Sequence, residues 1–212
     1  MPVTDGRSEQ DISQRTQYAK GGVGRLYWDI RDRAALDCVH GNRIVDVGCG
    51  EGLTLEKLIA QSPSGDVTGI DPDPRNIAIC RQHGLPVRQG SAYALPFDRE
   101  SVDTCVFMEV IEHLEQPEAA LEEMVRVLRP GGRLIVVFPY DFNMLLARIL
   151  CLRFKEARFD PHHLRQWSLG AIRKAGGKLG LTTIRSTGLP LPFPLSLHGL
   201  YVGEKPSTNG TA

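Results

Sequence analysis

Short runs of β-branched residues alternate with segments whose apolar residues recur at helical spacing through most of the chain. From Arg43 onward this alternation is typical of a parallel sheet whose strands are joined by crossover helices. A strand covered on both faces should be apolar throughout, as the fifth predicted strand is. The pattern predicts seven strands: Arg43–Gly48, Asp66–Asp71, Pro86–Gly90, Val102–Met108, Arg133–Phe138, Leu181–Ser186 and His198–Lys205.

Helical periodicity fills the intervals between these strands. Leu55, Leu58 and Ile59 share one face of a helix after the first strand. A later helix, with Leu128 on its apolar face, begins at Pro117, because proline is favoured in the first turn.

The two ends and one internal segment depart from this alternation. Residues 1–40 are expected to form an N-terminal helical or lid segment. Residues 41–205 are predicted to be the main domain, with an insertion or lid at 142–165. Residues 206–212 are expected to be a disordered tail.

Composition narrows the class of protein. A chain of 212 residues suggests one domain with small attachments. Its zero net charge gives no support for a nucleic-acid partner, and none is expected. The five cysteines form no CxxC pair, and no run of 18 apolar residues is present to span a membrane. The polar N-terminal stretch lacks the apolar region of a secretory signal, so a cytoplasmic location is predicted.

The richest chemical signal is the glycine-rich stretch that begins at Asp46, directly after the first strand. Gly48, Gly50 and Gly52 allow a sharp turn and a close approach of the backbone to a ligand. Asp71 ends the second strand, where a carboxylate can accept both hydroxyls of a ribose. These features alone fit either a dinucleotide or an adenosyl amino acid.

The glycine spacing distinguishes these two ligands. Dinucleotide folds carry G-x-G-x-x-G, whereas this chain has D-x-G-x-G-x-G, with Leu53 where the third glycine of that motif would fall. The acid at the base of the loop, Asp46, would repel a pyrophosphate. It can instead bind the ammonium group of an amino-acid tail.

Residues 43–139 resemble the small-molecule branch of the class I S-adenosylmethionine (SAM)-dependent methyltransferases, with a methyltransferase type 11-like domain. HHLRQWS also resembles a segment near the acceptor site of many members. The resemblance implies an α/β Rossmann-like fold: a seven-stranded sheet, mostly parallel with a C-terminal antiparallel strand, and helices on both faces. The matching segments, in order, are VDVGCGEG, GIDPDP, GSAYALPFDRESVD, MEVIEHL and VLRPGGRLIVVFP.

The resemblance also implies the cofactor, S-adenosyl-L-methionine, and its product, S-adenosyl-L-homocysteine (SAH). Ser91 replaces the usual family aspartate beside the adenine, and a neutral hydroxyl is a weaker acceptor than a carboxylate. The backbone N–H of Ala92 is therefore expected to take over part of adenine recognition. The expected cofactor-binding residues are Asp46, Gly48, Cys49, Gly50, Asp71, Pro72, Ser91, Ala92 and Met108.

Candidate catalytic residues follow from the same comparison. Glu109 and His113 lie four apart and are predicted to share one face of a short helix, either as a structural pair or close to the acceptor. His163, beside His162, is expected near the acceptor, where a histidine can take a proton near neutral pH. No metal site is predicted, because no third ligand has a suitable spacing to this histidine pair.

The acceptor is expected to be a small molecule, but the sequence does not indicate whether O, N, S or C is methylated, nor an oligomeric state. Residues 142–154 are apolar almost all round, which fits a lid helix, a wall for a lipophilic acceptor or a peripheral membrane contact. The Leu189–Leu195 loop is expected on the same side of the sheet. Two alternative functions stay open: a nicotinamide-dependent oxidoreductase and a non-catalytic SAM-binding module.

Overall fold

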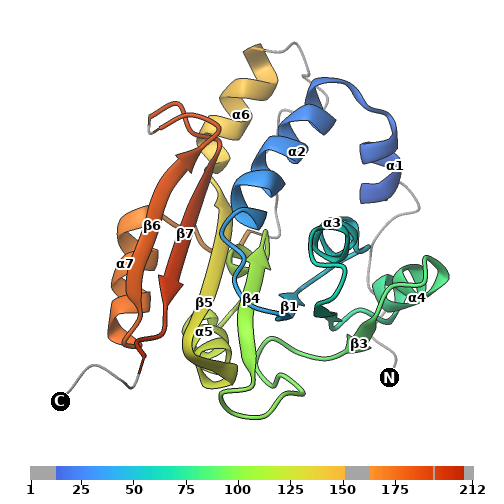
Figure 1. Cartoon of the computed structure of the whole chain (residues 1–212). Coiled ribbons are helices and arrows are strands. Elements are labelled where there is room, and N and C mark those ends of the chain that lie inside the picture. The colour runs from blue at the N-terminus through green and yellow to red at the C-terminus, as the bar shows by residue number, and fades with distance from the viewer. Residues whose placement is uncertain (1–12, 151–162, 193, 208–212) are drawn as a thin grey trace, which may run out of the picture.

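The computed structural model describes residues 13–150, 163–192 and 194–207. They form one seven-stranded sheet in the order β3-β2-β1-β4-β5-β7-β6 (Figure 1). Strands β1 to β5 pair in parallel, and β7 runs antiparallel to both β5 and β6. The strands are β1 Arg43–Val47, β2 Asp66–Asp71, β3 Val87–Gln89, β4 Val102–Met108, β5 Leu128–Pro139, β6 Thr182–Leu189 and β7 His198–Glu204.

The helices cover both faces of this sheet, as expected. Helices α5 and α7 contribute to one hydrophobic cluster and α2 and α3 to the other. None of the described helices is long and apolar enough to cross a membrane. The helices are α1 Gln14–Ala19, α2 Gly22–Leu36, α3 Leu53–Gln61, α4 Pro74–Gln82, the 3-10 helix η1 Ile111–His113, α5 Pro117–Val127, α6 Asp141–Leu150 and α7 Leu169–Lys178.

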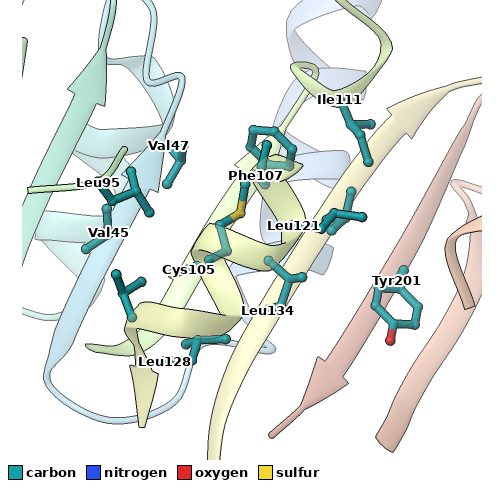
Figure 2. Close-up of a cluster of buried hydrophobic side chains, with 14 of the residues drawn as sticks. Val45, Val47, Leu95, Cys105, Phe107, Ile111, Leu121, Leu128, Leu134 and Tyr201 are labelled. Atoms are coloured by element: carbon teal, nitrogen blue, oxygen red, sulfur yellow. The ribbon is translucent and has the colours of Figure 1, made fainter. Parts of the chain in front are cut away.

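The central strands supply the core because successive side chains point to opposite faces of a sheet. On β4, Cys105 and Phe107 face α5, whereas Val106 and Met108 pack in the cluster on the α2 side. Figure 2 shows Phe107 of β4 in the first cluster together with Leu121 of α5. The apolar character of these strands is thus explained by cover on both faces.

The predicted fold class is confirmed, but element boundaries differ, notably for β5, which begins at Leu128 and not at Arg133, and for β6, which ends at Leu189 and not at Ser186. The predicted helix that includes Leu128 is wrong at its end, because α5 stops at Val127 and Leu128 already pairs with Val102. Pro130 explains the early stop, since the residue before a proline disfavours helical geometry.

Parts of the predicted organisation lie outside the described residues. These parts are residues 1–12 of the N-terminal segment, 151–162 of the insertion and 208–212 of the tail. Within the described chain, α1 and α2 occupy the N-terminal segment, and α6 occupies the start of the insertion.

Candidate functional site

The glycine loop after β1 adopts the left-handed backbone that its sequence predicts. Gly48, Gly50 and Gly52 have φ values of 74°, 54° and 83°. Space is also limiting, because a Cβ added at Gly48 would lie 2.4 Å from Cγ2 of Val110. Glycine at this position therefore lets the loop after β1 touch the loop after β4.

Asp71, at the end of β2, is bonded to this loop. Its Oδ2 accepts a 2.8 Å hydrogen bond from the backbone N–H of Gly50. Its Oδ1 accepts from the N–H of Asp73 at 2.9 Å and from the side-chain amide of Asn76 at 3.1 Å. A carboxylate has about four lone-pair sites, so Asp71 retains capacity to accept ribose hydroxyls.

Asp46 sits at the base of the loop, with only 2% of its surface exposed. Its Oδ2 is buried and has no hydrogen-bond partner among the described residues. Burial raises the pKa of Asp46 to about 8, and the negative charges of Asp32 and Asp71 contribute. Such an orphaned carboxylate oxygen fits a cationic donor, such as the ammonium of an amino acid.

The remaining predicted cofactor residues also lie at the carboxyl ends of strands β1, β2 and β4 or just beyond β3. Pro72 is exposed, whereas Ser91 and Ala92 are half-buried. Ser91 Oγ accepts a hydrogen bond from the backbone N–H of Tyr93. Cys49 and Met108 are buried, and Met108 packs in the core cluster on the α2 side. The structure thus gathers the predicted set at one edge of the sheet.

Helix α1 lies over the glycine loop, a contact that the sequence did not predict. The carboxylate of Glu51 accepts hydrogen bonds from the backbone N–H groups of Gln14, at 3.0 Å, and Arg15, at 2.9 Å. The Arg15 side chain donates to the carbonyl oxygen of Glu51 at 2.7 Å. An acid at a helix N-terminus is stabilising, so Glu51 anchors α1 onto the loop.

Glu109 does not share a helical face with His113, and that prediction is wrong. Glu109 precedes η1 and has a φ of 57°, outside any helix. Its Oε1 lies 2.9 Å from His198 Nε2, and its Oε2 lies 3.8 Å from an Arg31 nitrogen. Burial would raise the pKa of Glu109, but the interactions with His198 and the positive charge of Arg31 lower it to about 2.

His198 links Glu109 to Tyr27 of α2. It is 1% exposed, and its Nδ1 bonds the Tyr27 hydroxyl. Burial raises the pKa of Tyr27, and the Glu109 charge contributes. Sequence reasoning missed Tyr27, Arg31 and His198 because they come from α2 and β7, and no local motif joins them.

His113 and His163 do come together, as part of a second polar group. Their rings lie 4.8 Å apart, edge to face. His163 Nδ1 lies 2.8 Å from Oδ1 of Asp141, whose other oxygen accepts from Gln166. Burial raises the pKa of neighbouring Glu112 to about 9, and the charges of Glu109 and Asp141 contribute. The predicted role of His162 lies outside the described residues.

Comparison with known proteins decides the family. A family model described as a methyltransferase domain matches residues 45–136, which include the glycine loop and strands β1 to β4 with most of β5. This part of the chain is a methyltransferase domain of the SAM-dependent family. The catalytic assignments of Glu109, His113 and His163 stay predictions within that family.

Curated relatives of this methyltransferase chain act on different acceptors. A ubiquinone biosynthesis O-methyltransferase of Cereibacter sphaeroides is 37% identical over 164 residues, which cover 69% of this chain and 64% of the relative. A phthiotriol/phenolphthiotriol dimycocerosates methyltransferase of Mycobacterium leprae is 38% identical over 115 residues, covering 52% of this chain and 43% of the relative. The chain therefore spans less than two thirds of the length of these relatives.

Solved methyltransferase structures share the fold. The methyltransferase in a complex with the Haloferax volcanii Trm112 activator superposes with a TM-score of 0.69 at 22% identity. The match covers 92% of this chain and 96% of that one. At this identity the likeness establishes the fold alone.

Proposed function

We propose that this methyltransferase chain binds SAM at the glycine loop and transfers its methyl group to a small, lipophilic acceptor. The observation that carries the proposal is the hydrogen bond between Gly50 and Asp71, which holds the left-handed loop against a buried carboxylate. Asp71 would accept the ribose hydroxyls, and Asp46 would bind the ammonium group. The backbone at Ala92 would lie beside the adenine.

The main task of the protein in methyl transfer would be to position the cofactor and the acceptor. The sulfonium of SAM already activates the methyl group, so the acceptor must be held in line with the sulfur–methyl bond. Such orientation can contribute about 7–11 kcal/mol to lowering the barrier. An acceptor that carries a proton also needs a base that takes this proton.

Two apolar segments support a lipophilic acceptor. Phe142 and Leu146 on α6 and Leu191 on the loop after β6 are exposed. Asn143 ties these segments together, because its side-chain amide donates to the carbonyl oxygens of Pro194 and Ser196 at 2.9 and 2.7 Å. Helix α6 leaves the carboxyl end of β5, the same edge at which the glycine loop lies (Figure 1). Residues 151–154 of the predicted apolar segment lie outside the description.

The relatives add to this support. They include a ubiquinone biosynthesis O-methyltransferase and a phthiotriol/phenolphthiotriol dimycocerosates methyltransferase. We therefore favour a hydroxyl on a lipophilic molecule as the methylated group.

A transfer assay tests this proposal. The protein is incubated with SAM carrying an isotope-labelled methyl group and a panel of prenylated phenols and lipid alcohols, and SAH formation is measured by mass spectrometry. Acceptor-dependent SAH and a labelled product are expected. Tight SAM binding without product on any acceptor would support the non-catalytic module instead. Thermal stabilisation by NADH but not by SAM would support an oxidoreductase.

A further inference from the structure

A buried carboxylate and two imidazoles meet at the carboxyl end of β4. Glu112 and His113 belong to η1, and His163 lies in the segment that leads to α7. One possible ligand atom of each lies within 4.8 Å of those of the other two. The fold creates this group, since η1 and the segment before α7 are far apart in the sequence.

Glu112 is the member whose surroundings favour a cation. Its side chain is 2% exposed, and neither carboxylate oxygen has a hydrogen-bond partner among the described residues. His113 Nε2 lies 4.0 Å from Oε1 of Glu112, beyond hydrogen-bond distance. Buried carboxylates are normally paired or coordinate a metal. An ion bound between Glu112 and the two histidines would satisfy these oxygens.

The surroundings of His163 match those of a metal ligand. Its Nδ1 lies 2.8 and 2.9 Å from the two oxygens of Asp141. Metal-ligating histidines commonly donate their second ring N–H to a carboxylate, which fixes the ring and the tautomer. This arrangement makes Nε2 the nitrogen of His163 that would bind an ion.

The backbone also holds the two halves of the group together. The N–H groups of Leu164 and Arg165 donate to the carbonyl oxygen of Glu112 at 2.9 and 3.3 Å. The two residues that follow His163 are therefore bonded directly to η1. A site held in this way needs little rearrangement to bind an ion.

We propose that Glu112, His113 and His163 bind one divalent transition-metal cation, with Asp141 orienting His163. One carboxylate with two imidazoles is the donor set of His2Glu zinc sites and of sites for related divalent ions. Three protein ligands leave coordination positions for water or for an oxygen of the acceptor.

The location connects this ion to the proposed methyl transfer. Val110, two residues before Glu112, touches Gly48 of the cofactor loop. An ion on η1 would therefore lie beside the proposed SAM site, where it could hold an acceptor oxygen. This role rests on the proposed function, whereas the binding of the ion itself does not.

Metal binding is tested directly on the untagged full chain. The protein is stripped with a chelator and titrated with Co²⁺ and Zn²⁺, with binding followed by calorimetry and by the visible absorption of Co²⁺. One ion per chain is expected. Glu112→Gln and His163→Gln should each weaken binding by about 100-fold or more, and Asp141→Asn by about 10–100-fold. His83→Gln, at an exposed position on the distant α4 cap, is the matched control and should bind like wild type.

SAH binding of each variant is measured separately in the presence of chelator. Retained SAH affinity shows that a variant is folded, so loss of metal binding then supports the site. Absence of stoichiometric Co²⁺ and Zn²⁺ binding to the wild type would overturn the proposal. So would equal binding by Glu112→Gln, His163→Gln and wild type. Metal binding without methyl transfer would support the site while contradicting the proposed function.

Discussion

The backbone N–H of Gly50 donates a 2.8 Å hydrogen bond to Asp71 Oδ2, which joins the loop after β1 to the end of β2. These two segments are the ones expected to hold opposite ends of an adenosyl amino acid. The bond therefore positions both before any ligand arrives. Cofactor affinity should depend on loop geometry as well as on the acid itself.

Gly48→Ala should disrupt this geometry by steric clash. The new Cβ would lie 2.4 Å from Val110 Cγ2, and the φ of 74° adds backbone strain. A destabilisation of about 2–4 kcal/mol is expected in urea unfolding, with weaker SAH binding. Gly84→Ala is the matched control, because its φ of 69° is similar but no atom lies within 4 Å of the added Cβ.

Val110→Ala removes the opposing methyl groups and should relieve part of the Gly48→Ala defect. The double variant is then less destabilised than the sum of the two single changes. Simple additivity would contradict a clash between these two residues.

Asp46→Asn should change how the free energy of unfolding depends on pH. The pKa of Asp46 is raised to about 8 in the folded chain, against about 3.9 when unfolded. The folded state therefore binds the extra proton between these values, so this residue makes wild-type stability fall as the pH rises. The variant lacks this titration. Its free energy of unfolding should therefore rise relative to that of the wild type by up to about 1.4 kcal/mol per pH unit between these two pKa values. Urea unfolding from pH 5 to 8 checks the trend, and a constant difference would contradict it.

The same substitution should weaken SAH binding and change its pH dependence. The wild type gains affinity as the pH rises toward 8, because the ligand ammonium favours the charged form of Asp46. Asp46→Asn has no such proton to release, so its affinity should be nearly flat over this range. Parallel calorimetric profiles for the two proteins would contradict a direct contact with the ammonium.

Glu51→Gln should loosen α1 from the glycine loop. The neutral amide loses the charge-assisted hydrogen bonds from the N–H groups of Gln14 and Arg15. A hydrogen bond to a charged group contributes about 1.5–3 kcal/mol to stability. Faster hydrogen exchange in α1 is expected, together with faster release of SAH in stopped flow. Glu122→Gln, an exposed position on α5, controls for the loss of one negative charge. Unchanged exchange in α1 would show that Glu51 does not anchor it.

Truncation of the apolar side chains on α6 should affect acceptor binding more than chemistry. Phe142→Ala with Leu146→Ala removes exposed apolar surface from the proposed acceptor wall. The KM for a lipophilic acceptor should rise several-fold with little change in kcat. A fall in kcat at constant KM would argue against a binding wall.

The sequence predicted the parts of the site whose signals are local. The left-handed glycines, Asp46 and Asp71 lie within one strand–loop–helix–strand unit, so their spacing and chemistry can be read along the chain. The end of α5 was mispredicted, because sheet pairing begins at Leu128, ahead of Pro130.

Contacts between residues far apart in the sequence could not be predicted from local sequence patterns. His198 reaches Glu109 only because β7 inserts between β5 and β6. His163 reaches Glu112 and Asp141 only through the return of the chain after α6. The left-handed φ of Glu109 also moved that residue off the helical face that its spacing had suggested.

Calorimetric titration of SAH into wild type, Asp71→Ala and Asp73→Ala tests the cofactor site most directly. The wild type should bind one SAH with a Kd of about 1–10 μM, which corresponds to about −8 to −7 kcal/mol. Asp71→Ala should bind about 100-fold more weakly, because hydrogen bonds from the ribose to a charged acceptor are lost. Asp73→Ala, which removes the cap of α4 and the ion pair with Arg75 but keeps the backbone N–H that donates to Asp71, should match the wild type. Equal affinity of Asp71→Ala and wild type, or no binding by the wild type, would contradict the account.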